Sequence, residues 1–232
     1  MRFGGLHKNS LIDFPGKISC VLFWSGCNFD CPYCHNPDLA RGGCVGPPFW
    51  EEAQVFDFLS RRRGLLDGVV LSGGEPTLDA DVVRVARAIK ALGYAVKLDT
   101  NGSRPGVIRR LIDEGLVDYL AMDIKTDPHR YAPLIRKRAE PHDLMTSARI
   151  ILDAGLPHEF RTTCLKPFVD AAIVKNIARW IRGAALYALQ RFHPAEVLHP
   201  EFFLGADRLI DDAELSRFKA IAETEVQRCI IR

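Results

Sequence analysis

Short apolar runs alternate with amphipathic stretches along most of the chain. The apolar runs at 19–23, 69–71, 95–99, 119–124, 159–164 and 186–192 have the length of buried strands. Between two of them, Val82, Val85 and Ile89 recur at helical spacing and predict a helix that ends near Gly93. The same spacing predicts helices around 50–59, 108–112, 144–151, 173–181 and 215–222, before an apolar tail at 229–231. Strands that alternate with helices predict a parallel sheet.

The number of strand–helix units narrows the fold class. Six units are too few for a closed eight-stranded barrel, so we expect an α/β fold of the partial (β/α)6 TIM-like barrel type. No linker, composition shift or low-complexity segment divides the 232 residues, and 1–232 are therefore expected to form a single domain. A chain of this length can bury roughly 70% of its unfolded surface, which suffices for a stable core.

Charge and hydropathy exclude several kinds of partner. The chain has 31 Lys and Arg against 29 Asp and Glu, a net charge of +2, so it lacks the basic excess of a nucleic-acid binder. The longest apolar run, around 183–189, is too short to span a membrane. Because the first residues contain no apolar signal region, we expect a cytoplasmic protein with no nucleic-acid and no membrane partner.

Chemically distinctive residues follow the ends of the predicted strands, where parallel-sheet enzymes collect their reactive groups. Cys27, Cys31 and Cys34 follow the first strand, and the segment SGGEP at 72–76 follows the second. The segment DTNG at 99–102 follows the third strand. We therefore expect these segments to meet at one end of the barrel.

Side-chain alternation along the fourth predicted strand separates two faces. Leu120, Met122 and Ile124 share the face that should pack against the helices. Asp123 and Lys125 point the other way, into the barrel. Because charges in an interior are costly unless they are paired or used, these two residues form either an internal salt bridge or part of a site.

Three of the seven cysteines lie within eight residues, at Cys27, Cys31 and Cys34. Without an export signal, this pattern favours metal or redox chemistry over a disulfide framework. Cys31 and Cys34 form a C-x-x-C dithiol of the glutaredoxin-like kind. Adding His35 gives the haem-attachment pattern, which belongs to exported chains and is disfavoured here. Three thiolates with His35 could also bind zinc.

A further interpretation of the same cysteines is a [4Fe–4S] cluster held by only three thiolates. Electron-transfer clusters ordinarily use four cysteines. Three cysteines leave one iron with an open coordination position, as in catalytic metal sites. The spacing C-x₃-C-x₂-C, taken together with the motifs at the other strand ends, favours this cluster.

These motifs resemble those of the radical S-adenosylmethionine (SAM) superfamily over most of the chain. The resemblance is carried by the cysteine triplet, with aromatic Tyr33 before its last member, and by SGGEP at 72–76. GCNFDCPYCHNP, SGGEPTL, LDTNG and DIK are similar to segments of glycyl-radical activating enzymes, and SLIDFPGK resembles the activators of anaerobic ribonucleoside-triphosphate reductase. A bulky cysteine-rich insert is absent, so one cluster is expected.

The resemblance implies a role for each residue of these motifs. Cys27, Cys31 and Cys34 would bind the [4Fe–4S] cluster as the metal-binding and catalytic residues, and the remaining iron would bind the amino and carboxylate groups of SAM. The residues implied to contact SAM are Tyr33, Gly73, Gly74, Glu75, Asp99, Asp123, Lys125 and His193. The two glycines lack a Cβ atom, which would let their backbone approach SAM closely.

A monovalent-cation site is implied by the similarity to pyruvate formate-lyase activase. The corresponding groups in this sequence are Asp99, Thr100, the carbonyl of Ala121 and Asp123. A bound monovalent cation is therefore expected beside these groups.

The implied activity is that of an oxidoreductase. Flavodoxin or ferredoxin would supply one electron, SAM would be cleaved, and a glycine of a partner enzyme would lose its Cα hydrogen. The expected partner is anaerobic ribonucleotide reductase, with pyruvate formate-lyase or another glycyl-radical enzyme as the alternative. Three other hypotheses stay open: a small-molecule radical SAM enzyme such as 7-carboxy-7-deazaguanine synthase, a thiol oxidoreductase using Cys31 and Cys34, and a non-catalytic iron–sulfur or zinc sensor.

Overall fold

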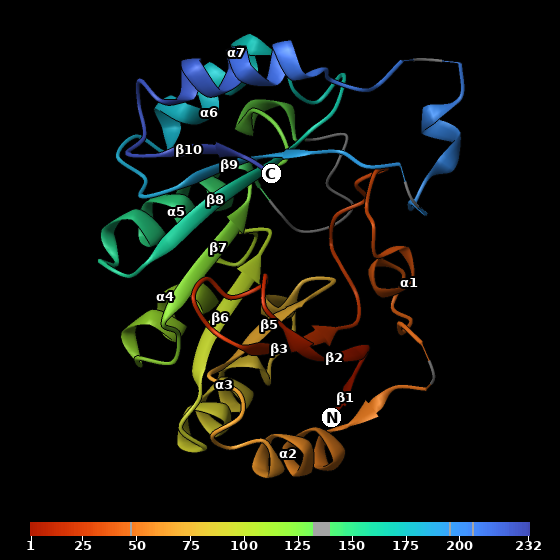
Figure 1. Cartoon of the computed structure of the whole chain (residues 1–232), viewed down its shortest axis with the longest axis vertical. Helices are drawn as coiled ribbons and strands as arrows, with labels where there is room; N and C mark the ends of the chain where they lie inside the picture. Colours follow the sequence, from red (N-terminus) through yellow and green to blue (C-terminus); the bar gives the residue numbers. More distant parts are fainter. Residues whose placement is uncertain (47, 132–139, 195, 206) are drawn as a thin grey trace.

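A computed structural model describes residues 1–46, 48–131, 140–194, 196–205 and 207–232 (Figure 1). The strands of its main sheet are β2 (Gly5–Ser10), β3 (Ser19–Trp24), β5 (Gly68–Gly73), β6 (Ala95–Thr100), β7 (Tyr119–Asp123), β8 (His158–Cys164), β9 (Tyr187–Arg191) and β10 (Cys229–Ile231). The helices are α1 (Pro37–Ala40), α2 (Glu52–Arg61), α3 (Val82–Ala91), α4 (Pro105–Asp113), α5 (Pro141–Asp153), α6 (Ala171–Trp180) and α7 (Asp212–Ala222). Two short strands, β1 (Arg2–Phe3) and β4 (Trp50–Glu51), pair separately.

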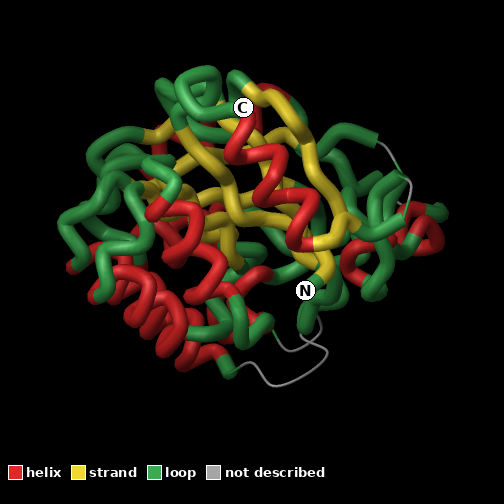
Figure 2. The backbone as a smooth tube through the Cα atoms, turned by 90° about the horizontal axis from the view of Figure 1, so that it is seen from below, coloured by secondary structure: helices red, strands yellow, loops and turns green. Residues whose placement is uncertain are grey.

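The main sheet has eight strands in the order β10-β9-β8-β7-β6-β5-β3-β2. Every neighbouring pair from β3 to β10 is parallel, whereas β2 runs antiparallel to β3. Within the described ranges, β2 and β10 stand at two unpaired edges, so the sheet curves without closing. Helices surround the strands, as Figure 2 shows. The expected partial α/β barrel is confirmed.

The six predicted strands correspond to β3 and β5 to β9, and the predicted helices correspond to α2 to α7. Two strands of the sheet were not predicted. In β2, His7, Lys8 and Asn9 are all exposed at the sheet edge, so no apolar alternation marks the strand. The apolar tail at Cys229–Ile231 becomes β10 only through its parallel pairing with β9. The predicted helix at 50–59 starts later, at Glu52, because Trp50 pairs with Phe3.

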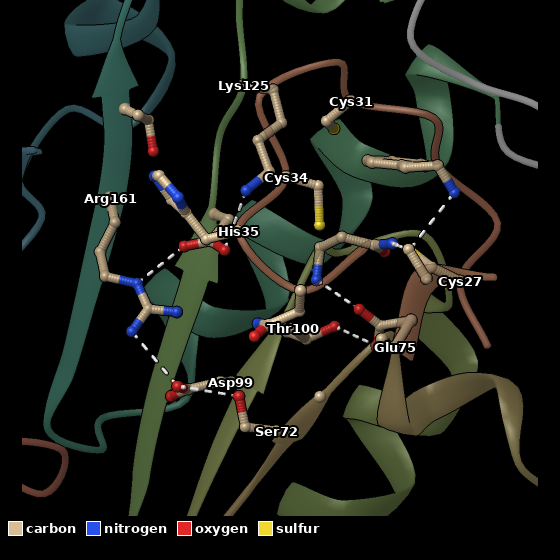
Figure 3. Close-up of a pocket in the computed structure, with 18 of the residues that line it drawn as sticks. Cys27, Cys31, Cys34, His35, Ser72, Glu75, Asp99, Thr100, Lys125 and Arg161 are labelled. Carbon is tan, nitrogen blue, oxygen red and sulfur yellow. Dashed lines mark hydrogen bonds and ion pairs between the residues drawn. The ribbon is translucent and has the colours of Figure 1, made fainter. Parts of the chain in front are cut away.

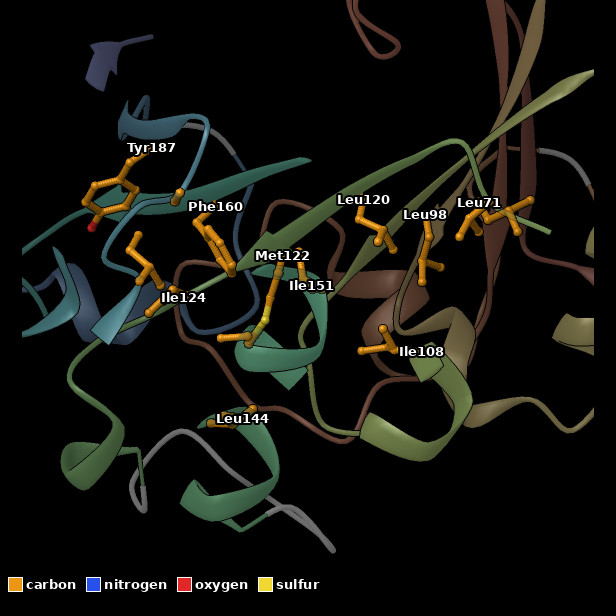
Figure 4. Close-up of a cluster of buried hydrophobic side chains, with 14 of the residues drawn as sticks. Leu71, Leu98, Ile108, Leu120, Met122, Ile124, Leu144, Ile151, Phe160 and Tyr187 are labelled. Atoms are coloured by element: carbon orange, nitrogen blue, oxygen red, sulfur yellow. The ribbon is translucent and has the colours of Figure 1, made fainter. Parts of the chain in front are cut away.

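The hydrophobic core lies between the sheet and its covering helices. Leu120, Met122 and Ile124 of β7 and its end are fully buried and lie beside Ile108 of α4 and Ile151 of α5 (Figure 4). This confirms the predicted faces of the fourth strand. Because these three side chains face the helices, the side chains between them on β7 face the barrel interior. None of the described helices is long and apolar enough to cross a membrane.

Candidate active site

A cavity of about 310 Å³ lies at the carboxyl ends of the parallel strands (Figure 3). The predicted site residues that line it are Cys27, Cys31, Tyr33, Cys34, Gly73, Gly74, Glu75, Asp99, Asp123 and Lys125. His193 does not line the cavity; it is exposed and lies near His35, which does line it. Burial lowers the pKa of His35, and the neighbouring His193 lowers it further. The structure thus brings all but one of the predicted residues together.

The loop that carries the three cysteines is held from the end of β6. Asn101 donates from Nδ2 to Oδ1 of Asn28 at 2.9 Å and to Sγ of Cys27 at 3.8 Å. The backbone N–H of Phe29 also donates to Sγ of Cys27, at 3.4 Å. The TNG segment therefore supports the first cysteine directly, a link between two motifs that the sequence does not reveal.

A segment after β9 holds the other side of the cysteine loop. The backbone N–H of Leu198 donates to the carbonyl of Cys34, and that of His199 donates to the carbonyl of Pro32, both at 3.1 Å. His199 Nε2 lies 2.7 Å from Oδ1 of Asp30. The loop is thus fixed by residues from both halves of the chain.

The thiols of the cavity bear on the choice between the chemical hypotheses. Burial raises the pKa of Cys27 to about 11 and that of Cys31 to about 12, so both are protonated at neutral pH. Thiol–disulfide exchange and metal ligation both require a thiolate, so the protonation of these thiols does not separate a dithiol from a cluster. The composition of the cavity does, because a dithiol needs only Cys31 and Cys34, whereas Cys27 lines the same cavity. In the described part of the chain, no three His, Cys, Asp or Glu side chains converge closely enough to hold a single ion. Thiols that share a cavity without meeting at one point fit a cluster of several irons better than zinc.

Thiol alkylation tests this protonation state. We expect Cys27 and Cys31 of the cluster-free protein to react slowly with iodoacetamide at neutral pH, because burial raises the pKa of both thiols and keeps them protonated. The rate should rise about tenfold per pH unit up to about pH 10. Mass spectrometry of anaerobic samples measures it, with denatured protein as the control. Rapid modification of native Cys31 at pH 7 would show that the thiol is ionised despite its burial.

Gly73 and Gly74 are required by the packing of the chain itself. Gly73 has a φ of +121°, and a Cβ there would lie 2.3 Å from the carbonyl oxygen of Trp24. A Cβ on Gly74 would lie 2.0 Å from the carbonyl oxygen of Gly26, next to Cys27. The absent Cβ atoms were expected to make room for SAM. The structure adds a different cause, which is the contact between β5 and the cysteine loop.

Substitution of Gly74 should consequently disturb the cysteines. We expect Gly74→Ala to lower both the melting temperature and the iron content after reconstitution, because the added methyl group must push the backbone of Gly26 aside. Gly106→Ala is the matched control, since a Cβ there meets nothing within 4 Å. Iron analysis and thermal unfolding measure the two effects. Full iron content and an unchanged melting temperature in Gly74→Ala would show that the contact is not needed.

Glu75 lines the cavity but uses its carboxylate within the protein. The residue is only 2% exposed, and it accepts hydrogen bonds from Oγ1 of Thr100 at 2.8 Å and from the backbone N–H of Asn101 at 2.6 Å. The backbone N–H of Thr77 donates to it as well, at 3.1 Å. Burial raises the pKa of Glu75, while these donors oppose the increase. Its observed contacts therefore orient the turn after β6.

A row of alternating charges crosses the cavity wall. Lys125 Nζ lies 3.0 Å from Oδ2 of Asp123, and Arg161 Nε lies 2.7 Å from Oδ1 of the same residue. Arg161 also reaches Oδ2 of Asp99 at 3.3 Å (Figure 3). Burial would raise the pKa of Asp123, but the charges of Arg161 and Lys125 outweigh it and lower that pKa. The predicted salt bridge exists, and it lies in the wall of the cavity.

Arg161 was missed in the sequence because no motif surrounds it. The register of β7 against β8 places it directly beside Asp123. The available indication was the alternation of Glu159, Arg161 and Thr163 along one face of the strand, with Phe160 and Cys164 on the other face.

The chain belongs to the Radical SAM superfamily, whose family model matches residues 21–180. Solved structures share its fold: SuiB of Streptococcus suis, bound to the precursor peptide SuiA, aligns with a TM-score of 0.65 at 13% identity. That alignment covers 91% of this chain and 48% of SuiB. The structure of anSMEcpe with bound AdoMet gives a TM-score of 0.59 at 12% identity, covering 86% of this chain and 58% of that one.

Within the superfamily, the chain groups with the glycyl-radical enzyme activating enzymes. A Methanocaldococcus jannaschii protein provisionally named as such an enzyme is 34% identical over 98% of this chain and 94% of its own length. The pyruvate formate-lyase-activating enzyme of Clostridium pasteurianum is 30% identical over 83% of this chain and 82% of its own length. Enzymes of this superfamily use a [4Fe–4S] cluster and SAM. The chain is thus a radical SAM oxidoreductase.

Proposed function

We propose that this enzyme cleaves SAM reductively and generates a glycyl radical on anaerobic ribonucleoside-triphosphate reductase. The observation that supports this proposal is that the cysteines, the glycines and the charged residues all line one cavity. Its wall combines the thiols of Cys27, Cys31 and Cys34 with the backbone of Gly73 and Gly74 and with the charged row. The thiols are soft ligands that suit an iron–sulfur cluster. The fixed charges beside them suit the charged amino-acid part of SAM.

The three thiols would hold the cluster, and the charged row would orient SAM. Lys125 and Arg161 present positive charge for its carboxylate, and the remaining lone pairs of Asp99 and Asp123 can accept hydrogen bonds from its ribose hydroxyls. When bound, the cluster supplies the single electron for the cleavage of SAM, and flavodoxin or ferredoxin is the proposed donor. The protein contributes position and electrostatics, while the cofactors carry the chemistry.

The proposed partner follows from the N-terminal segment SLIDFPGK, which resembles the activators of ribonucleotide reductase. The similarity to pyruvate formate-lyase-activating enzymes supports a second candidate, pyruvate formate-lyase. The sheet edges at β2 and β10 leave the barrel unclosed, which suits a substrate that is itself a protein segment.

Anaerobic reconstitution followed by electron paramagnetic resonance tests the proposal. Reconstituted enzyme, SAM, reduced flavodoxin and one candidate partner are combined, and the spectrum is searched for the doublet of a glycyl radical. We expect the doublet with the reductase alone, and its loss when the target glycine of the partner is changed to alanine. A doublet on pyruvate formate-lyase alone would assign the second candidate. Cleavage of SAM without a radical on either protein would contradict an activase function.

A further inference from the structure

Each carboxylate oxygen of Asp99 and Asp123 already has a cation of the protein beside it. Lys97 pairs with Oδ1 of Asp99, and Arg161 lies 3.3 Å from Oδ2. Arg161 and Lys125 take the two oxygens of Asp123, at 2.7 and 3.0 Å. Over the described ranges, none of these four oxygens is left without a positive partner.

Thr100, whose side chain is also implied in the monovalent-cation site, already makes two hydrogen bonds within the protein. The hydroxyl of Thr100 donates to Glu75 at 2.8 Å and accepts from the backbone N–H of Gly102 at 3.1 Å. A potassium or sodium ion at Asp99 and Asp123 would have to displace ammonium or guanidinium groups. The side chains of Asp99, Thr100 and Asp123 therefore do not fit the monovalent cation that the resemblance implies.

Lys97 has no motif of its own, yet its placement is unusual. It lies on β6 two residues before Asp99, so both side chains share one face of the strand. Its side chain is only 2% exposed, and its ammonium lies 5.8 Å from the centre of the Tyr119 ring. Lysine is rarely so buried unless it is paired, and the partner here is a carboxylate of the cavity wall.

When Lys97 is counted with the row of charges in the cavity wall, the net charge of the row is positive. Lys97, Lys125 and Arg161 carry three positive charges against the two negative charges of Asp99 and Asp123. Glu159 lies 3.8 Å from Arg161 but has its own cation, Arg232, at 2.8 Å. The row therefore offers the excess positive charge that an added metal ion would otherwise bring to a carboxylate ligand.

We propose that Lys97 and Arg161 take the place of a monovalent cation, so that SAM binding by this enzyme needs no alkali ion. The inference rests on the proposed binding of SAM in this cavity. Lys97 acts through Asp99 and is a positioning residue, whereas Arg161 borders the cavity itself.

Isothermal titration of SAM into the anaerobically reconstituted enzyme tests whether SAM binding needs an alkali ion. The affinity is measured in tetramethylammonium chloride and in potassium or sodium chloride at equal ionic strength. We expect the dissociation constants to agree within about twofold. An affinity about tenfold weaker in tetramethylammonium would overturn the inference. Absence of SAM binding in every buffer would instead contradict the proposed function.

Two variants test the role of Lys97. Lys97→Ala removes the ammonium and leaves room for an ion, whereas Lys97→Met removes the charge but fills the space. We expect Lys97→Ala to bind SAM at least about tenfold more weakly in tetramethylammonium and to recover in potassium, and Lys97→Met not to recover. A Lys97→Ala enzyme with the same affinity for SAM in both salts would contradict the proposal that Lys97 takes the place of the cation. Should neither variant fold, the wild-type comparison decides alone.

Discussion

Replacement of Cys27, Cys31 and Cys34 together by alanine is expected to abolish iron binding. The reconstituted wild-type enzyme should hold about four irons, because three thiolates that line one cavity complete a single [4Fe–4S] cluster. The apolar methyl groups of the variant offer no ligand for iron. Iron and sulfide analysis measures the loss directly, and the brown chromophore of the cluster reports it independently.

Single changes of the other cysteines are the control for this experiment. Cys20, Cys44, Cys164 and Cys229 do not line the cavity, so their replacement by serine or alanine should leave the iron content intact. A triple variant that still holds a full cluster would refute the assignment of the three ligands. A control variant that loses its iron while staying folded would add that cysteine to the site.

Replacement of Asp123 and Lys125, singly and together, is expected to change the stability of the fold and the cleavage of SAM in different ways. Asp123→Leu alone deprives Lys125 and partly Arg161 of a partner, which should cost roughly 3–5 kcal/mol of unfolding free energy. Lys125→Met alone should cost less, because Asp123 keeps Arg161 at 2.7 Å. In the double variant one charge of each sign is removed, and Arg161 retains Asp99. The double variant should therefore fold with near wild-type stability and yet fail to cleave SAM.

Melting temperature and release of 5′-deoxyadenosine, measured on the same anaerobic samples, distinguish the outcomes. A stable and fully active double variant would remove both residues from the SAM site. A double variant less stable than either single one would show that the pair is more strongly coupled to its surroundings than the observed contacts indicate. Iron content on each sample verifies that the cluster ligands are unaffected.

The strand–helix alternation and the position of the site at the strand ends were accessible from the sequence, because both follow from local periodicity. Val82, Val85 and Ile89 mark a helix face without reference to any distant residue, and helix α3 occurs there. The cysteine spacing likewise identifies its loop alone. These features agree with the structure because local pattern and global fold favour the same arrangement.

The missed features depend on contacts between distant parts of the chain. Strand β2 exists only because β3 pairs with it across the turn at 11–18. Arg161 enters the site through the register of β7 and β8, and Gly74 is constrained by Gly26. His193 follows β9 as expected, but the direction of the chain beyond the strand leaves its side chain outside the cavity lining. No local pattern encodes such pairings.

The contacts between the cysteine loop and the segment after β9 determine when the site can be completed during synthesis. The loop leaves the ribosome early, yet His199, which pairs with Asp30, lies 169 residues further along the chain. Because domains fold from the N-terminus as they emerge, β3, β5 and β6 can assemble while the carbonyls of Pro32 and Cys34 still lack their donors. The cysteine loop can therefore make its full set of backbone contacts only once the segment at 198–199 has been synthesised.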